Sequence, residues 1–250
     1  MTLFRVSPVC SPAHEFAACY ALVARVFAPD ELVARNEYEH LLRRADDAAH
    51  PHRFAMLAAW DGDTLLGLIA GSTMTLDGDP SRCVGLIEYL AVAPDAPHHH
   101  GIGSGLLDAF EDAAAHEARA RHESFSAIVG EVDEPLLPFK FAHGYRLAEG
   151  VRYAQPPIAF DAEGSALHPI VPKLLAIKPF ALADPHAIDA NLLESIVRTI
   201  VRWRYVPMFG AEHAKQRAAA MIDRDVVVPF VDSLGDRAAI PLIQYVAARP

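Results

Sequence analysis

Three glycines at the start of a predicted helix are the first residues in this sequence whose types and spacing could do chemistry. Gly101, Gly103 and Gly105 lead into apolar residues of helical spacing that continue to Ala114. The first N–H groups of a helix have no helical partners, and the helix dipole favours negative charge there. Glycine lets a phosphate approach the backbone because it has no Cβ. The pattern therefore predicts a site for a phosphate-bearing cofactor.

The two common nucleotide motifs fit this glycine pattern poorly. A P-loop needs Lys-Ser or Lys-Thr at the end of a longer glycine loop, and the sequence has neither here. The dinucleotide fingerprint needs Gly-x-Gly-x-x-Gly directly after a strand. The third glycine comes one place early, and seven residues, 94–100, separate the glycines from the preceding apolar run. An NAD-type oxidoreductase is therefore disfavoured.

A single carboxylate, Glu88, interrupts the apolar, strand-like run from Gly85 to Ala93. Glu88 shares its strand face with Leu86 and Leu90, so the sequence predicts a partly buried carboxyl group. Such a group can act as a general base near neutral pH. The alternative is a structural carboxylate paired with a basic or hydroxyl group inside the sheet.

The elements that would position these residues can be predicted from the alternation of apolar and polar residues. The first half of the chain reads as a strand, two helices, three antiparallel strands and the glycine-led helix, with a hairpin turn at Asp61-Gly62-Asp63. A fifth strand, a short helix ended by a left-handed Gly144 and a sixth strand follow. The predicted ranges are 2–6, 11–28, 30–44, 54–60, 64–75, 82–93, 101–115, 124–132, 135–143 and a strand entered at 145.

Beyond Gly150 the prolines cluster, and four more elements are predicted. They are a seventh strand at Val171–Ile177, a helix at Ala187–Tyr205, a helix at residues 211–223 and a last strand at Val226–Val231. We expect a domain of residues 1–155 and an extension of residues 156–250 that serves as a lid, a dimerisation element or a degenerate second half.

The segment around the glycines resembles motif A of the GNAT superfamily of acyl-CoA-dependent N-acetyltransferases. In that motif a strand reading Leu-x-Val-x-Pro is followed by Arg/Gln-x-x-Gly-x-Gly/Ala at the start of a helix. This chain has Leu90-Ala91-Val92-Ala93-Pro94 and then His98-His99-His100-Gly101-Ile102-Gly103. His98 stands where the family usually has Arg or Gln.

The resemblance implies which residues hold acyl-CoA. The backbone of Leu90, Ala91 and Val92 would face the thioester and pantetheine, next to a β-bulge. The loop formed by His98, His99, His100, Gly101, Ile102, Gly103 and Ser104 would hold the CoA diphosphate. Glu88 would be the base, because the family often has a glutamate on this strand. We assign no metal, since three consecutive side chains such as His98–His100 cannot readily aim at one ion.

Motif B of the family is degraded in this chain. Asp133 occupies the place of the family's Asn, Lys140 the place of its Tyr, and Gly144-Tyr145 the place of its Gly-Phe. Asp133 and Lys140 are therefore carried over as cofactor-binding positions. The family's usual acid is missing, so solvent, Lys140, His143 or a tyrosine from elsewhere would protonate the leaving thiolate.

The resemblance implies a GNAT-like α/β (α+β) fold, with a mixed, mainly antiparallel seven-strand sheet flanked by helices. It also implies transfer of an acetyl or short acyl group from acetyl-CoA to a primary amine in a direct ternary complex. The missing tyrosine leaves a non-catalytic acyl-CoA-binding or regulatory module as the alternative. The acceptor, a small molecule or a peptide amine, is not fixed by the sequence. Tyr38 and Glu37 are candidates to contact it.

Composition narrows the possible partners. With 52% hydrophobic residues and a mean hydropathy of +0.15, the 250-residue chain can bury a substantial core. A net charge of −10 disfavours nucleic acid and anionic membranes. The three cysteines have no metal or redox spacing, the N-terminus lacks a signal pattern, and no apolar run approaches the ~18 residues of a membrane helix. We therefore expect a cytoplasmic protein that could form a homodimer.

Overall fold

The computed structural model describes residues 4–9, 14–44, 50–96, 101–206 and 211–244. They fall into two compact units: residues 1–74 with 85–122, and residues 75–84 with 123–250. This division differs from the boundary expected at residue 155, which stays a prediction about domains. The long strands β3 (Thr64–Leu76) and β4 (Asp79–Val92) each contribute residues to both units.

The first unit is a layer of strands between helices. Its strands are neighbours in the order β1-β2-β3-β4, and β1–β2 and β2–β3 pair antiparallel. The predicted hairpin turn is confirmed, with Gly62 at φ +56°. The elements are β1 (Arg5–Pro8), α1 (His14–Val26), a 3₁₀ turn (Pro29–Glu31), α2 (Arg35–Arg44), β2 (His52–Asp61), β3 (Thr64–Leu76), β4 (Asp79–Val92) and α3 (Ile102–Ala120).

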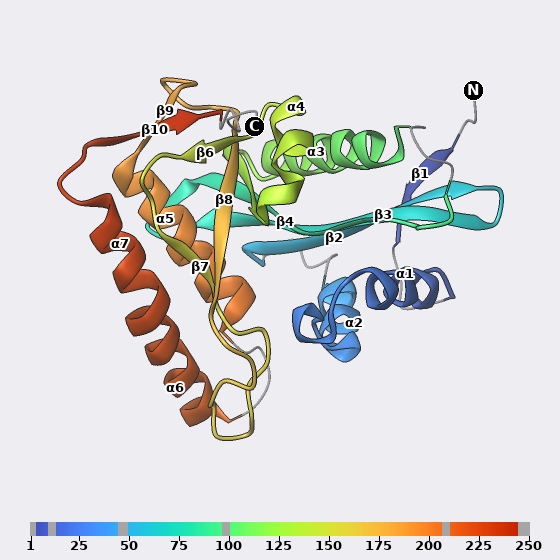
Figure 1. Ribbon diagram of the computed structural model, residues 1–250, viewed down its shortest axis with the longest axis horizontal. Helices are drawn as coiled ribbons and strands as arrows, with labels where there is room; N and C mark the ends of the chain where they lie inside the picture. The colour runs from blue at the N-terminus through green and yellow to red at the C-terminus, as the bar shows by residue number, and fades with distance from the viewer. Residues whose placement is uncertain (1–3, 10–13, 45–49, 97–100, 207–210, 245–250) are drawn as a thin grey trace. The chain divides into compact units, whose positions relative to one another are not determined.

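Helices cover both faces of this layer (Figure 1). Helices α1 and α2 lie on one face, where the rings of Tyr38 and Phe54 are 5.3 Å apart. Helix α3 lies on the other face, and a Cβ added to Gly71 would meet the ring of Phe110 at 2.6 Å. The buried face of α3 carries its apolar residues at helical spacing, as the sequence predicts: Leu106, Leu107, Phe110, Ala114 and Ala118.

The second unit is built on its own strands, in the neighbour order β5-β8-β6-β10-β9, with β7 paired to β8. The β5–β8 and β6–β8 pairs are antiparallel. Its elements are β5 (Ser124–Val132), a 3₁₀ turn (Glu134–Leu136), α4 (Leu137–Ala142), β6 (Arg146–Ala148), β7 (Tyr153–Gln155), β8 (Val171–Pro179), β9 (Ala187–Asp189), α5 (Ala190–Ile200), a π-helical segment (Val201–Tyr205), α6 (Glu212–Ile222), a second π-helical segment (Asp223–Val227), α7 (Val228–Leu234) and β10 (Ala239–Ile243).

Two predictions for this unit are wrong. The expected strand Val226–Val231 is helical, because Val226, Val227 and Phe230 share one buried face at helical spacing, and the second π-helical segment continues directly into α7. The expected seven strands become ten across the described residues, four in the first unit and six in the second. The short strands β7, β9 and β10 account for the difference, since runs of three to five residues carry little periodicity.

The predicted fold class is confirmed: the chain is a mixed α/β protein with a largely antiparallel arrangement of strands, which are flanked by helices. The left-handed Gly144 after α4 is also confirmed, with φ +82°. Among the helices that the structure describes, none is both long enough and apolar enough to cross a membrane.

Candidate functional site

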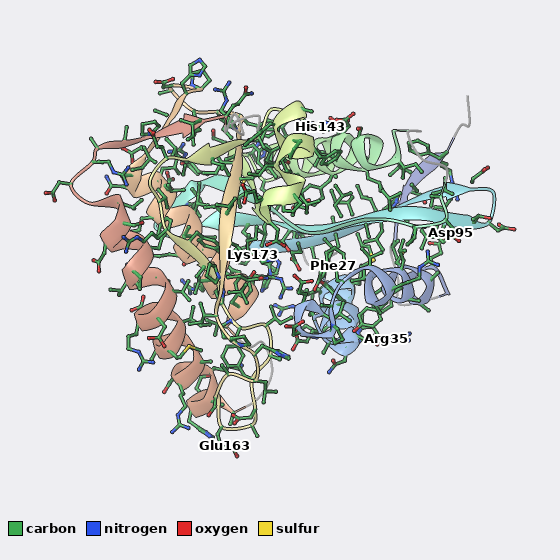
Figure 2. All side chains as sticks on the ribbon, viewed as in Figure 1. Phe27, Arg35, Asp95, His143, Glu163 and Lys173 are labelled. Atoms are coloured by element: carbon green, nitrogen blue, oxygen red, sulfur yellow. The ribbon has the colours of Figure 1, made fainter. Side chains whose placement is uncertain are left out.

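The turn after β4 is held by the first unit itself. The N–H of Ala93 donates to the carbonyl of Leu66 on β3 at 2.8 Å, and Ala96 N–H donates back to the carbonyl of Ala93 at 2.9 Å. Asp95, labelled in Figure 2, pairs with Arg25 at the end of α1 at 2.7 Å. Backbone and charge contacts therefore fix the end of β4 and direct the chain into the loop that precedes α3.

Helix α3 begins as the glycine pattern predicts. Gly101 lies in the left-handed region at φ +71°, with nothing within 4 Å of an added Cβ. Gly101 is the N-cap of α3, and its carbonyl accepts from Gly105 N–H at 2.8 Å, so the amides of Ile102 and Gly103 come before the first helical hydrogen bond. The first turn contains no acidic residue. This end of α3 can therefore receive an anion.

The third glycine, Gly105, is needed for packing. A Cβ on Gly105 would lie 2.8 Å from the ring of Phe4, so this glycine allows the chain before β1 to pack against α3. The helix positions Gly103 and Ser104 are half-buried and Ile102 is buried. His98, His99 and His100 lie outside the described residues, and their assignment to the cofactor stays a prediction.

Glu88 is partly exposed and is held by hydroxyl groups within the first unit. Ser72 Oγ on β3 donates to Glu88 Oε1 at 2.8 Å, and Tyr38 OH on α2 donates to Oε2 at 3.4 Å. His52 Nε2 on β2 lies 2.7 Å from the same Ser72 Oγ. Ser72 and Tyr38 are almost fully buried, at 0% and 1% exposed. Hydroxyl groups are neutral, so these two donors orient the carboxylate without adding an opposite charge beside it.

Strand β4 departs from regular alternation at this carboxylate. Successive side chains of a regular strand point to opposite faces. Glu88 accepts a hydrogen bond from Tyr38 on α2. The side chain of the following residue, Tyr89, also contacts Tyr38, with 5.9 Å between the ring centres, and the Tyr89 hydroxyl accepts from Val33 N–H at 3.2 Å. Both side chains therefore reach the α2 side. Of the next residues, Leu90 is half-buried, Ala91 buried and Val92 38% exposed.

The two positions carried over from motif B belong to the second unit. Asp133 is exposed and forms an ion pair with Lys173 at 2.8 Å. Lys140 is 5% exposed, and its ammonium lies 4.6 Å from the ring centre of Tyr145. Tyr145 is itself fully buried. Their roles toward acyl-CoA stay predictions.

A second carboxylate in that unit is bound by two phenols. Tyr153 OH and Tyr205 OH both donate to Glu131, one to each carboxylate oxygen, and Gln155 donates to Tyr205 OH at 3.3 Å. Burial, reinforced by the Glu131 charge, raises the pKa of both phenols well above its ordinary value. These tyrosines therefore hold their protons tightly, which suits a structural cluster better than an acid.

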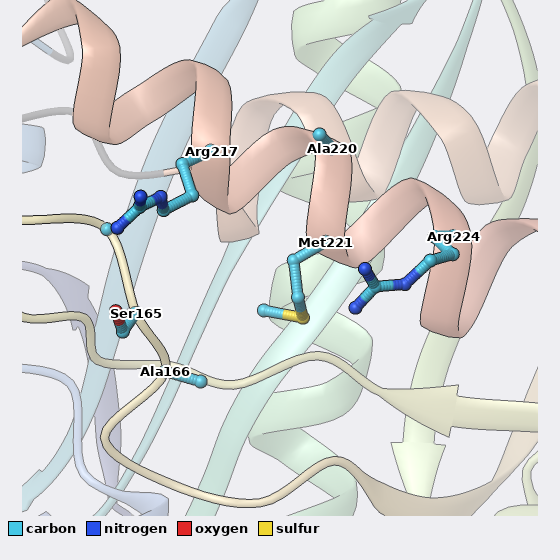
Figure 3. A pocket seen from close by; sticks show the side chains of 7 residues that line it. Ser165, Ala166, Arg217, Ala220, Met221 and Arg224 are labelled. Atoms are coloured by element: carbon cyan, nitrogen blue, oxygen red, sulfur yellow. The ribbon is translucent and has the colours of Figure 1, made fainter.

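The second unit also contains a hollow of about 430 Å³ (Figure 3). Arg217 and Arg224 lie at its edge, and Arg224 is already paired with Asp225 at 2.6 Å. Arg217 donates to the carbonyl of Glu163 at 3.4 Å. No residue predicted to bind acyl-CoA lines it; the lining is Gly164, Ser165, Ala166, Arg217, Ala220, Met221 and Arg224. Within the described ranges, no group of three His, Cys, Asp or Glu side chains could hold a metal ion.

The segment that carries α1, α2, Glu88 and the start of α3 also matches a known family. Residues 18–138 fit the model of the Acetyltransferase (GNAT) family. This segment belongs to the GNAT acetyltransferases. The family match spans the motif A positions 90–104 and the motif B position Asp133, and ends just before Lys140. A search of curated proteins found no match to the chain.

Solved structures agree on the fold. A protein assigned to the GNAT family from Bacteroides thetaiotaomicron is 20% identical, with a TM-score of 0.54 over 80% of this chain and 98% of that chain. A chain of the NatC complex bound to Gag peptide and CoA is 17% identical, with a TM-score of 0.50 over 71% and 99%. A protein assigned as an acetyltransferase from Staphylococcus epidermidis is 10% identical, with a TM-score of 0.50 over 72% and 100%. The family and fold thus support acyl-CoA-dependent acetyl transfer in general.

Sequence reasoning identified Glu88 but not the residues that hold it. Ser72 lies within a predicted strand, whereas His52 falls outside the strand predicted at 54–60. No sequence signal places them together. Ser72 lies opposite Phe54 because a bulge at Ala59/Trp60 shifts the register of the β2–β3 hairpin by one residue, and this puts His52, Phe54 and Ser72 on one face.

Proposed function

We propose that this chain is an N-acyltransferase that moves an acetyl or short acyl group from acyl-CoA to a primary amine. Glu88 is the general base in this proposal. The segment from His98 to Ser104 binds the CoA diphosphate, and the backbone of Leu90, Ala91 and Val92 faces the thioester arm. Both substrates are bound together, so the acyl group passes directly between them.

One observation supports this proposal most. Glu88, a partly exposed carboxylate on β4, accepts a hydrogen bond from the buried Ser72 hydroxyl on the neighbouring strand β3, and β4 precedes the glycine-led start of α3 in the chain. In the alternative, a structural carboxylate would pair with a basic or hydroxyl group in the sheet, and the kinetic test below separates the two roles. The Ser72 and Tyr38 hydroxyls donate to the two carboxylate oxygens of Glu88 and orient the group that would accept the proton.

The chemistry follows from these groups. A protonated amine must lose a proton before its nitrogen lone pair can attack the thioester carbonyl carbon, and Glu88 takes that proton directly or through water. Backbone N–H groups near the thioester would stabilise the oxygen anion of the tetrahedral intermediate. The carbon–sulfur bond then breaks, the amide forms, and the CoA thiolate leaves and gains a proton. Because the family's tyrosine is replaced by Lys140, solvent is the simplest source of that proton.

The test measures thiol release from acetyl-CoA with a panel of amines, alongside calorimetry of acetyl-CoA binding. Glu88→Gln should lower kcat roughly 10²- to 10⁴-fold, the usual contribution of a general base, with little change in acetyl-CoA affinity. Asp63→Asn is the matched control, because Asp63 is an exposed carboxylate in the hairpin turn of the same unit. Wild-type turnover by Glu88→Gln would remove Glu88 from the mechanism.

If the chain is instead a non-catalytic acyl-CoA-binding or regulatory module, the same two assays give a different result. In that case acetyl-CoA binds, no amine in the panel releases thiol above the uncatalysed rate, and Glu88→Gln changes nothing. A wild-type protein that does not bind acetyl-CoA would refute both versions. Mass spectrometry of the ligand that copurifies with the protein then identifies the cofactor.

A further inference from the structure

Three neighbouring strands of the first unit place a line of polar side chains on one face. His52 on β2, Ser72 on β3 and Glu88 on β4 are linked by contacts of 2.7 Å and 2.8 Å. Ser72 is fully buried and His52 is 5% exposed, whereas Glu88 is partly exposed. The line therefore runs from the buried interior to the carboxylate proposed as the base.

The hydrogens of this line can be assigned by counting. A serine hydroxyl has one hydrogen and can accept further bonds at its oxygen. The Ser72 hydrogen is used toward Glu88 Oε1, so the contact between Ser72 Oγ and His52 Nε2 needs a hydrogen on the histidine nitrogen. While Glu88 is ionised, His52 must therefore carry a hydrogen on Nε2.

The position of His52 is itself fixed. Its backbone N–H donates to Nδ1 of His50 at 3.2 Å, and its Cα pairs in register with Met74 on β3. His52 is the first residue of β2 and lies opposite Met74. From there its imidazole reaches Ser72, which lies two residues before Met74 on β3. A fixed donor at Nε2 leaves the Ser72 hydroxyl one favourable rotamer, directed at Glu88.

We propose that Ser72 and His52 are positioning residues for Glu88: His52 Nε2–H fixes the Ser72 hydroxyl, which anchors Oε1 and so fixes the orientation of the carboxylate. This inference rests on the proposed role of Glu88 as the base. The contact that Ser72 makes with Oε1, at 2.8 Å, is the shorter of the two hydroxyl contacts to the carboxylate, since Tyr38 OH lies 3.4 Å from Oε2.

The kinetic test compares conservative and disruptive variants at each position. Ser72→Ala and His52→Leu should each lower kcat roughly ten- to a hundredfold, because a misplaced reacting group loses orientation, while KM for acetyl-CoA stays within about twofold. Ser72→Thr keeps a hydroxyl, and His52→Gln keeps N–H donors on its amide, so both should retain most of the wild-type kcat. Thermal unfolding of each variant separates loss of folding from loss of orientation.

A measurement that needs no acceptor checks the hydrogen count. Long-range proton–nitrogen NMR on ¹⁵N-labelled protein reports which imidazole nitrogen carries the hydrogen, and loss of one signal in His52→Gln assigns His52 among the 13 histidines. We expect a hydrogen on His52 Nε2 in the wild type. A neutral His52 with its hydrogen on Nδ1 and none on Nε2 would overturn the inference.

The outcomes also separate this inference from the proposed function. If Glu88→Gln loses activity while Ser72→Ala and His52→Leu match the wild type, the positioning role is refuted and the proposed function stands. If His52→Gln loses as much kcat as His52→Leu, an N–H donor is not enough and the positioning role is again refuted. If the wild type binds no acetyl-CoA or transfers to no amine, both are refuted together.

Discussion

Gly67 on β3 lies directly against the backbone of β4, where a Cβ on Gly67 would sit 2.7 Å from the carbonyl oxygen of Ala91. The same Cβ would lie 3.2 Å from side-chain atoms of Ile102 and Leu106 on α3. This glycine therefore allows the end of β4 and the start of α3 to approach β3 together. Both are segments that we propose to hold acyl-CoA.

Gly67→Ala should destabilise the fold and weaken cofactor binding. The added methyl group cannot be accommodated without moving the backbone of Ala91, and such overpacking typically costs ~1–3 kcal/mol. Urea unfolding measures the stability, and calorimetry measures the acetyl-CoA affinity. Thr64→Ala is the control, because Thr64 lies on the same strand but is exposed. Equal stability of the two variants would contradict the close approach.

Gly103→Asp should separate binding from folding. A carboxylate in the first turn of α3 is favourable for the helix dipole, by ~0.3–1 kcal/mol, so the melting temperature should be unchanged or slightly higher. The same charge would repel a diphosphate, so acetyl-CoA binding should fall below detection by calorimetry. Gly103→Ala adds volume without charge and serves as the control. Unchanged affinity in Gly103→Asp would place the diphosphate elsewhere.

Tyr153 and Tyr205 should make the protein sensitive to alkali. Their pKa is raised in the folded state above the ordinary value of 10.0, first by burial and then by the Glu131 charge. Their stabilising contribution is thus complete below pH 10 and is lost as the pH rises further, because the unfolded phenols ionise while the folded ones cannot. Each phenol should contribute a slope of about 1.4 kcal/mol per pH unit above pH 10.

The measurement is the free energy of unfolding in urea between about pH 9 and pH 11. Tyr153→Phe should reduce the slope of the free energy of unfolding against pH, above pH 10, by the contribution of one phenol. The double variant Tyr153→Phe with Tyr205→Phe should remove the contributions of both phenols. A slope that is the same in the wild type and the double variant would show that these phenols ionise normally in the folded protein.

Cys19 should be inert to thiol reagents in the folded protein. Burial on α1, with a smaller effect from the Glu15 charge, raises the pKa of its thiol to about 12, so almost no thiolate exists at pH 8. Labelling with a disulfide reagent, followed by peptide mass spectrometry, should modify Cys19 slowly until guanidinium unfolds the chain. Rapid modification of native Cys19 would show that α1 opens locally.

The sequence by itself determined the features that depend on neighbouring residues. The hairpin turn at Gly62, the left-handed cap at Gly144 and the helical face of α3 all follow from local conformational preference and short periodicity. Motif A also spans few residues, so its glycines and the strand with Glu88 could be found without the structure. Where a run was short or locally ambiguous, as at Val226–Val231, burial against distant residues decided in favour of a helix.

Only the tertiary structure decided what surrounds the carboxylate. Glu88 lies 16 residues after Ser72 and 50 after Tyr38, so their contacts depend on the register of three strands and on the helix that covers them. It also decided that Lys140 is buried against an aromatic ring rather than solvated. A side chain's residue type sets which chemistry it can perform, but its hydrogen-bond partners are set by packing between segments that are distant in the chain.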